Sequence, residues 1–278
     1  MKKHYSYPVV LSIAGTDPSG GAGIQADLKT FSALGCYGMS AITALVAQNT
    51  KGVRSIHNVP PSFVKEQLDT VLEDICPHAI KIGMVHTPEL VEVIAATLKH
   101  YPDIPVVFDP VMIATSGDRL IEEPTVDAII NELFPLTAVI TPNMDEASFL
   151  ISENITTVAD MEQAGVKIVN LGCNNVLLKG GHLQSKELTS ILFNKNGVVE
   201  KYTSHRVETN NVHGSGCTLS SAIASCIARG ETLEKAVALA QEYINGAIQQ
   251  GADVAIGNGN GPLNHFYNPH KMIKNEME

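Results

Sequence analysis

Short apolar runs alternate with helix-like segments along most of this chain. The runs that we expect to form strands cover residues 9–14, 40–46, 79–85, 105–108, 138–141 and 175–179. Between these runs, apolar residues recur every three or four positions and so share one helical face: Ile24, Leu28, Phe31 and Leu34, then Val64, Leu68, Val71, Leu72 and Ile75, then Val91, Ile94, Ala95 and Leu98. Strands that alternate with helices predict an α/β fold, in which helices cover both faces of a mostly parallel sheet.

The final third of the chain breaks this alternation. Residues 188–193 and 198–202 flank the turn Asn194-Lys195-Asn196-Gly197, which predicts a late antiparallel hairpin. Two helices are expected after it, over residues 218–229 and 232–250, followed by a loose glycine-rich tail at 257–262. Because no repeat, low-complexity tract or linker interrupts the pattern, we expect a single domain over residues 1–278.

The composition supports a folded domain and narrows its partners. Hydrophobic residues make up 44% of the chain and charged residues 17%, which allows a large buried core. The formal net charge of −10 disfavours nonspecific binding to nucleic acid or to an anionic membrane. No run approaches the ~20 apolar residues of a membrane span. The run at 9–14 is also too short for a signal-peptide core. Five cysteines without CxxC spacing indicate neither a disulfide framework nor a zinc site, so we expect a reducing cytoplasm.

Polar and glycine-rich motifs stand where the expected strands end. They are Gly15 to Gly23, Gln48-Asn49-Thr50, Gly83-Met84, Asp109-Pro110-Val111-Met112, Thr141-Pro142-Asn143 and Lys179-Gly180-Gly181-His182. Ligands of parallel sheets collect outside the carboxyl ends of the strands, so the joint position of these motifs predicts one ligand site. The loop at 15–23 matches neither GxGxxG nor GxxxxGK[ST], and the dinucleotide and P-loop fingerprints are therefore both absent.

The acidic residues in these motifs each have a structural and a functional interpretation. Asp17 either caps nearby backbone amides or contacts a ligand. Asp109 either forms an ordinary turn before a proline or attracts Mg²⁺, which prefers oxygen ligands. Asn143 and Glu146 either open a helix, where acidic residues are favourable, or form the outer part of a metal site that faces phosphates. The sequence leaves all three alternatives open.

Two further polar residues point to ligand chemistry. Lys179 ends an apolar strand, where a lysine suits a phosphate counter-charge although most lysines are surface groups. Gln48 ends a very apolar stretch, and its amide both donates and accepts, so it suits a ring nitrogen that lies next to an amino group. The alternative for Gln48 is a buried glutamine with satisfied hydrogen bonds. His182 is expected to support its loop.

The segment Asn-Val-His-Gly-Ser-Gly-Cys-Thr at 211–218 lies at the expected start of a helix. Its glycines allow backbone to approach a ligand closely, and a helix N-terminus offers unpaired N–H groups and a partial positive charge. An anionic oxygen fits there, beside Cys217. We also expect the helix N-terminus to lower the pKa of the Cys217 thiol.

A Cys217 thiolate has two possible roles. It acts as a general base that deprotonates a substrate hydroxyl, or as a covalent nucleophile that needs a nearby histidine and an orienting partner. The flanking glycines favour the base, because they prepare an anion site beside the thiol. His213 is four residues away, and the sequence leaves it unassigned. The other cysteines, Cys36, Cys76, Cys173 and Cys226, are expected to be small buried hydrophobes.

Taken in order, the motifs resemble one enzyme family. They are residues 15–27 (GTDPSGGAGIQAD), 47–50 (AQNT), 109–112 (DPVM), 141–143 (TPN), 179–182 (KGGH) and 213–218 (HGSGCT). Over about residues 8–250 this set is similar to the bacterial hydroxymethylpyrimidine/phosphomethylpyrimidine kinases of thiamine biosynthesis, which belong to the ribokinase-like superfamily. The resemblance implies a three-layer ribokinase-like fold. It also implies an ATP- and Mg²⁺-dependent kinase that phosphorylates 4-amino-5-hydroxymethyl-2-methylpyrimidine and then its monophosphate.

The resemblance also assigns roles to residues. Gln48 would read the aminopyrimidine edge, in a substrate pocket lined by Gly15, Asp17, Met84 and Val111. The anion hole for the transferring phosphoryl group would be formed by Gly214, Gly216 and the Cys217 amide. Cys217 stands where most ribokinase-like enzymes have an aspartate base. Asp109, Asn143 and Glu146 correspond to the Mg²⁺ and phosphate region, with Asp109 and Glu146 as metal ligands, while Lys179 and Ser215 correspond to phosphate contacts.

The resemblance leaves several alternatives open. The family commonly has threonine in place of Ser215, which retains the hydroxyl but puts the packing of the loop in doubt. Some related pyridoxal kinases carry a cysteine in the segment that reads Val111-Met112-Ile113-Ala114-Thr115-Ser116 here, and its absence favours the pyrimidine over pyridoxal or pyridoxine. A non-catalytic binding protein and a covalent thiol enzyme are the alternatives from other classes. The apolar stretch at 40–46 and the resemblance together predict a homodimer.

Overall fold

The computed structural model describes residues 4–112 and 121–277 of the chain. Eight strands form the main sheet: β2 (Val9–Ala14), β3 (Tyr37–Ile42), β6 (Ala79–Ile82), β7 (Val106–Phe108), β8 (Val139–Ile140), β9 (Asn175–Leu178), β10 (Glu187–Asn194) and β11 (Gly197–His205). Two further pairs stand apart from it: β4 (Ala44–Asn49) with β5 (Gly52–Asn58), and β1 (Tyr5–Ser6) with β12 (Asn275–Glu276).

The helices fill the connections between the strands. They are α1 (Gly23–Ala33), α2 (Pro61–Leu72), α3 (Pro88–Leu98), α4 (Glu123–Ala128), α5 (Met144–Ile151), α6 (Val158–Val169), α7 (Ser215–Ala228) and α8 (Leu233–Gly251), with short helical turns at Ile129–Leu133 and Phe134–Leu136. None of the helices in the described ranges is both long and apolar enough to cross a membrane. Residues 113–116, which belong to the segment in which some pyridoxal kinases carry a cysteine, lie outside the described residues.

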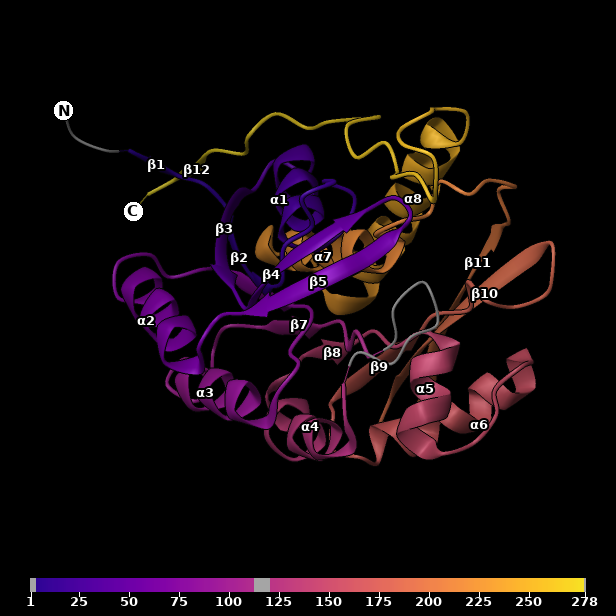
Figure 1. The fold of residues 1–278 in the computed structure, drawn as a ribbon, viewed down its shortest axis with the longest axis horizontal. Coiled ribbons are helices and arrows are strands. Elements are labelled where there is room, and N and C mark those ends of the chain that lie inside the picture. The colour runs from indigo at the N-terminus through magenta and orange to yellow at the C-terminus, as the bar shows by residue number, and fades with distance from the viewer. Residues whose placement is uncertain (1–3, 113–120, 278) are drawn as a thin grey trace.

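The main sheet has the strand order β11-β10-β9-β8-β7-β6-β2-β3 (Figure 1). Strands β3, β2, β6, β7, β8 and β9 pair in parallel, and β10 pairs antiparallel with both β9 and β11. The expected mostly parallel α/β sheet with a late antiparallel hairpin is therefore confirmed. The chain goes from β2 outward to β3 and then returns to the other side of β2 with β6. This reversal is the kind of switch point at which such sheets bind ligands.

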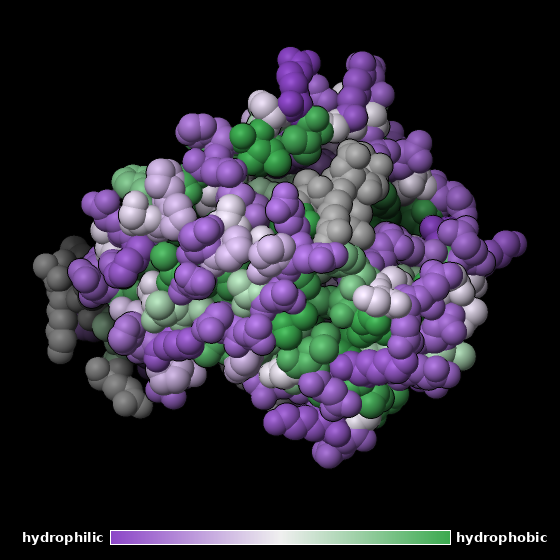
Figure 2. Space-filling model, turned by 60° about the horizontal axis from the view of Figure 1, so that its bottom comes forward, coloured by the Kyte–Doolittle hydropathy of each residue, from purple (hydrophilic) through white to green (hydrophobic). Residues whose placement is uncertain are grey.

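Alternate residues of the buried strands enter two separate cores. In β2, Leu11 and Ile13 belong to the core under α2, α3 and α6, whereas Val10 belongs to the core under α1, α7 and α8. Successive side chains of a strand point to opposite faces, so a strand covered on both faces is apolar at most positions. On the molecular face shown in Figure 2, polar side chains predominate and apolar ones gather in patches between them.

The expected strand at 40–46 is wrong, because the chain leaves the main sheet in the middle of this stretch. At Thr43 the backbone N–H donates to the Ala14 carbonyl (3.0 Å) and the hydroxyl donates to the Met84 carbonyl (3.0 Å). After it, β4 pairs with β5 in a separate two-stranded sheet, a hairpin that we call the flap (residues 44–58). The break is not visible in the apolar run at 40–46, because its first part belongs to β3 of the main sheet and its last part to β4 of the flap.

The helix expected at 218–229 starts three residues earlier than predicted. Helix α7 begins at Ser215, with Gly214 as the residue before its first turn, so Cys217 lies inside that turn. The other boundaries agree within a few residues. Helix α8, for example, begins at Leu233 and is capped by the hydroxyl of Thr232, which accepts from the Lys235 N–H.

Candidate active site

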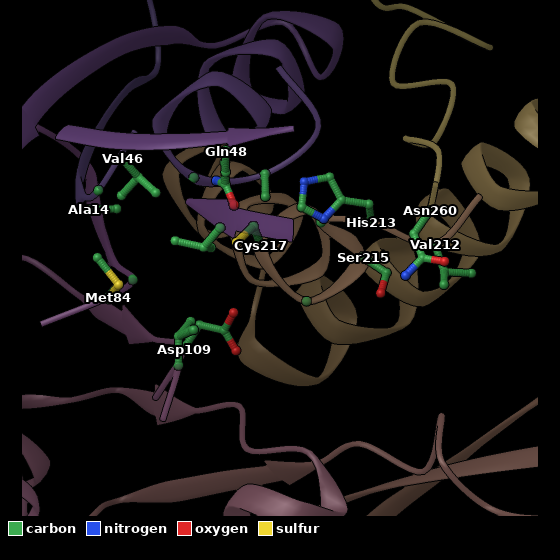
Figure 3. A pocket seen from close by; sticks show the side chains of 18 of the residues that line it. Ala14, Val46, Gln48, Met84, Asp109, Val212, His213, Ser215, Cys217 and Asn260 are labelled. Carbon is green, nitrogen blue, oxygen red and sulfur yellow. The ribbon is translucent and has the colours of Figure 1, made fainter. Parts of the chain in front are cut away.

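A pocket of about 460 Å³ lies at the carboxyl ends of the parallel strands, under the flap (Figure 3). Of the residues predicted to form the site, those that line it are Gly15, Gln48, Met84, Val111, Asp109, Asn143, Glu146, Lys179, Gly214, Ser215, Gly216 and Cys217. In Figure 3, Ala14, Val46 and Met84 gather at one end, and Val212, Ser215 and Asn260 at the other. Asp17 is the one predicted site residue that does not line this pocket.

The first turn of α7 presents backbone donors to the pocket. The Ser215 N–H bonds to the Val212 carbonyl (3.1 Å) and the Thr218 N–H to that of Gly214 (2.9 Å). Gly216 and Cys217 lie between these two residues, and neither of their N–H groups has a hydrogen-bond acceptor within residues 4–112 and 121–277. Gly214 holds a left-handed conformation (φ 80°), and a Cβ there would lie 1.8 Å from the Gly21 carbonyl oxygen. The loop after β2 therefore packs directly against the start of α7.

A buried ion pair faces this turn. The Lys179 ammonium lies 2.8 Å from the Asp109 carboxylate, which also accepts from the Thr141 hydroxyl at 2.9 Å. A Cβ on Gly216 would lie 3.2 Å from Lys179 Nζ and 3.3 Å from Asp109 Oδ2, so both charges approach the helix start closely. Burial opposes ionisation of Asp109, but the positive charges of Lys179 and Lys81 outweigh it and lower the pKa of the carboxyl group.

Asn143 and Glu146 form the helix start that the sequence offered as one alternative. The Asn143 side chain accepts from the Glu146 N–H (2.9 Å), and the Glu146 carboxylate accepts from the Asn143 N–H (2.7 Å), which is a capping box for α5. Both residues also line the pocket. Burial raises the pKa of Glu146 to about 7, against the opposing charge of Lys179.

The donor set fits a magnesium ion that is shared with phosphates. Asp109 and Glu146 are 2% and 3% exposed, and both line the pocket. Among the described residues, no group of three or more His, Cys, Asp or Glu side chains could hold a metal by itself. Magnesium commonly uses one or two carboxylates and completes its shell with water and phosphate oxygens, so two carboxylates suffice.

The pKa of Cys217 contradicts the expectation from its place at a helix N-terminus. Burial raises the pKa of the thiol to about 11, and the Lys81 charge offsets only part of this effect. The thiol is therefore protonated at neutral pH in the ligand-free protein. Of the other cysteines, Cys36, Cys173 and Cys226 are buried as expected, but Cys76 is exposed, and its expected burial is wrong.

The sequence analysis did not identify Lys81, the positive charge that partly offsets the raised pKa of Cys217. Lys81, in β6, lines the pocket, is fully buried and lies 2.9 Å from both oxygens of Asp27. Ser12 and Ser221 donate to the same carboxylate at 2.5 and 2.7 Å. Burial opposes protonation, but Asp27, Cys217 and Asp109 raise the pKa of Lys81. The sequence did contain a signal for Lys81, because it is a lone lysine inside the apolar run at 79–85.

Asp17 is fully buried beneath its loop. Its carboxylate accepts from the N–H groups of Ser19, Gly21 and Ala22 at 2.8–3.0 Å. It also lies 2.8 Å from Nε2 of His213, the residue that the sequence left unassigned. Burial opposes ionisation, but His213 and the loop donors lower the pKa of Asp17. This geometry matches the amide-capping interpretation of Asp17, with the added function of orienting His213, which does line the pocket.

The flap covers the other side of the pocket. A register shift between Ala47 and Gln48 interrupts the pairing of β4 with β5, so Gln48 lies opposite Val53. Such a bulge redirects a side chain, and in Figure 3 the Gln48 amide points from the flap into the pocket. Gly15 also lines the pocket, and a Cβ there would come within 2.9 Å of Met84 Cε.

His182 has a peripheral place at the pocket. Its Nδ1 lies 2.8 Å from Asp145, and both side chains are more than half exposed. It lines the rim of the pocket together with Asp145. The pair ties the loop after β9 to the start of α5, as expected for a residue that supports its loop.

Known proteins resemble this chain in sequence and in fold. A family model described as phosphomethylpyrimidine kinase matches residues 17–264. A hydroxymethylpyrimidine/phosphomethylpyrimidine kinase of Rhizobium meliloti is 46% identical over 93% of this chain and 97% of its own length. A thiamine biosynthesis bifunctional protein of Geobacter sulfurreducens is also 46% identical over 92% of this chain, which spans only 52% of that protein. The pyridoxal kinase of Staphylococcus aureus in complex with AMP-PCP is 32% identical, with a TM-score of 0.87, over 98% of this chain and all of that one.

Proposed function

The chain belongs to the phosphomethylpyrimidine kinase family, and from this premise we propose that it transfers the γ-phosphoryl group of ATP to the hydroxymethyl group of 4-amino-5-hydroxymethyl-2-methylpyrimidine. A second transfer, to the resulting monophosphate, gives the diphosphate used in thiamine biosynthesis. The observation that carries the proposal is one pocket in which an anion-binding helix start and Gln48 of the flap both line the wall.

In this proposal, different residues of the pocket bind the phosphates and the pyrimidine. The free N–H groups of Gly216 and Cys217 bind the oxygens of the transferring phosphoryl group, with Ser215 beside them. Lys179 neutralises phosphate charge, and Asn143 lines the same region. Gln48 pairs with the ring nitrogen and the amino group of the pyrimidine, over a floor formed by Gly15, Met84 and Val111. Phosphoryl transfer needs mainly positioning and charge neutralisation, which these groups supply.

Cys217 is the proposed general base of the reaction. The thiol first gives up its proton to water, and the resulting thiolate then accepts the proton of the substrate hydroxyl; the charge of Lys81 favours the ionised form. In the loose transition state of phosphoryl transfer, the attacking oxygen keeps its proton until late, when it has become more acidic. Asp17 orients His213 beside this centre and makes no direct contact with the pyrimidine.

Asp109 and Glu146 are the proposed magnesium ligands. When bound, the ion would neutralise charge on the phosphates of ATP. A carboxyl group must lose its proton to bind the ion, and the Glu146 pKa of about 7 makes this loss incomplete at neutral pH.

Affinity for Mg·ATP is therefore expected to fall as the pH drops below about 7, the pKa of Glu146. The protonated form dominates below that value, so each further unit of pH should weaken binding by up to about tenfold. Calorimetric titration of the protein with Mg·ATP between pH 6 and 8 measures this. In Glu146→Gln, affinity at pH 8 should be lower and its pH dependence weaker. Protonation of ATP itself is common to both proteins, so equal pH profiles would contradict the assignment.

Replacing Gln48 by Glu should raise KM for the pyrimidine by about tenfold to a hundredfold, because the carboxylate cannot donate to a ring nitrogen and a lost hydrogen bond costs ~1–3 kcal/mol. The KM for ATP should stay within about twofold. Steady-state kinetics with each substrate varied in turn measures both constants. Ser55→Ala, in the same flap opposite Ala47, is the matched control. An unchanged pyrimidine KM in Gln48→Glu would place ring recognition elsewhere.

The substrate proposal is tested with purified protein, Mg·ATP and four acceptors: the pyrimidine, its monophosphate, pyridoxal and pyridoxine. Following ADP release should give the highest kcat/KM for the pyrimidine or its monophosphate. Pyridoxal kinase is the second candidate, because the likeness to the Staphylococcus aureus enzyme covers nearly the whole chain. A higher kcat/KM with pyridoxal or pyridoxine would establish that activity instead, and no ADP release with any acceptor would indicate a non-catalytic binding protein.

The proposal extends to assembly and location. We propose a single catalytic domain that works in the cytoplasm as a homodimer. The flap supports the dimer, because Leu45 on β4 is 49% exposed. Tyr37, on the edge strand β3 of the main sheet, is 47% exposed. Light scattering coupled to size-exclusion chromatography gives the mass, and a monomer at micromolar concentration would contradict the dimer.

A further inference from the structure

The glycine-rich segment at 257–262 is attached to the flap. The Asn260 N–H donates to the Thr50 carbonyl (2.8 Å), and the Gly259 N–H donates to the Thr50 hydroxyl (3.2 Å). Thr50 lies in the turn between β4 and β5, two residues after Gln48. In Figure 1 the tip of this hairpin meets the yellow C-terminal loop beside α8. The expectation of a loose tail is therefore wrong for this segment.

The glycine spacing in this segment follows from its contacts. A Cβ on Gly257 would lie 2.3 Å from the Thr50 hydroxyl oxygen, and one on Gly259 would lie 2.0 Å from the Thr50 carbonyl oxygen. A Cβ on Gly261 would lie 2.1 Å from Oδ1 of Asn211. Every second residue is thus glycine because the backbone packs against the flap turn at two positions and against Asn211 at the third.

The same segment is joined to the start of α7. The His213 N–H donates to the Gly261 carbonyl (3.1 Å), and the Asn211 side chain donates to the carbonyls of Gly251 and Val254 at 2.7 and 2.8 Å. Asn260 itself lines the pocket, and in Figure 3 its side chain lies beside Val212 and Ser215. One loop therefore contacts both the flap that carries Gln48 and the turn that carries Cys217.

The attachment of loop to flap is weak enough to open. Residues 253–260 are exposed to solvent, and within the described part of the chain only two hydrogen bonds join the loop to Thr50. Hydrogen bonds of this kind each add only a small net stabilisation, because water can replace either partner. Segments with few buried contacts open locally at little cost, so the flap can release and re-form this contact while the two cores stay intact.

We propose that the loop 257–262 is a latch that holds the flap closed over the pocket and thereby positions Gln48 against the bound ring, with Thr50 as the positioning residue. The inference rests on the proposed function for its substrate, but the latch itself is a contact between two segments. Its opening and closing can be measured without any substrate.

The first test is tryptic cleavage of the flap turn, which contains Lys51 and is joined to the latch at Thr50. Gly259→Ala places a methyl group against the Thr50 carbonyl and forbids the closed contact. Loss of both hydrogen bonds should speed cleavage after Lys51 by roughly tenfold. Asn258→Ala is the matched control, because that side chain has no hydrogen bond within the described residues, and it should be cleaved like the parent. Equal cleavage rates in Gly259→Ala and the parent would overturn the latch.

The second test separates positioning from stability. Gly259→Ala should raise KM for the pyrimidine by roughly tenfold, with kcat and the unfolding temperature little changed, because the loop lies outside both cores. Thr50→Val removes one of the two bonds and should give a smaller rise, of about threefold. A fall in kcat with an unchanged pyrimidine KM would overturn the role in positioning Gln48. If the pyrimidine is not a substrate, the cleavage test still decides whether the latch exists.

Discussion

Replacing Cys217 by Ala is expected to lower kcat by about two to four orders of magnitude, the range typical for loss of a positioned general base. ATP affinity should stay close to that of the parent. The phosphate contacts proposed here come from backbone N–H groups and Lys179, which the substitution leaves in place. Steady-state turnover and calorimetric titration with ATP measure the two quantities separately.

The pH profile distinguishes a base from a residue that only packs. The pKa of Cys217 is raised to about 11, so kcat/KM of the parent should rise with pH above neutrality as the thiolate fraction grows. In Cys217→Ala this rise should disappear. Normal turnover in the variant would refute the base assignment. A trapped covalent substrate adduct on Cys217, seen by mass spectrometry, would favour the nucleophile.

Gly214→Ala is expected to reduce kcat/KM by at least about a hundredfold and to destabilise the fold. The left-handed backbone (φ 80°) is strained for alanine, and the added methyl carbon would lie 1.8 Å from the Gly21 carbonyl oxygen. Strain of this kind costs ~1–3 kcal/mol before any contact is lost, and the overlap must also push the loop and the helix start apart. The N–H groups of Gly216 and Cys217, which we propose bind phosphate, would move with the helix start.

Gly181→Ala is the matched control for this substitution. Gly181 also follows a strand near the pocket, but its φ is not left-handed and a Cβ there meets nothing within 4 Å. Its turnover and unfolding temperature should match those of the parent. If Gly214→Ala retained parental kcat/KM, close contact between the two loops would not be needed for the reaction.

The sequence predicted the sheet because strand burial on both faces leaves a local signal. Residues 9–14 are apolar except for Ser12, and they form β2 with the expected boundaries. The turn at 194–197 likewise predicted the β10–β11 hairpin. The flap was missed for a related reason. Residues 40–46 read like one buried strand, but the chain leaves the main sheet after Thr43, and the next residues bond to Thr16 and to β5 instead.

The site was predicted by location more than by individual residues. Motifs at the ends of parallel strands must converge, so their residues could be grouped before any coordinates were known. Asp17 is the exception, because its carboxylate is used by its own loop. No pattern in the sequence links Asp17 to His213, or Asp27 to Lys81, because each pair joins residues that are far apart in the chain.

By itself, the sequence determined the α/β fold, the edge of the sheet that carries the site, and the presence of a glycine-rich helix start next to a cysteine. These follow from short-range patterns of polarity and from backbone chemistry. Only the tertiary structure decided the charge state of that cysteine. Burial removes the water that would stabilise a thiolate, and this effect exceeds that of Lys81, so the pKa of Cys217 rises where the helix position alone predicted a fall. The place of the glycine-rich segment was also decided by tertiary contacts, because its order comes from Thr50 and Asn211, which are distant in sequence.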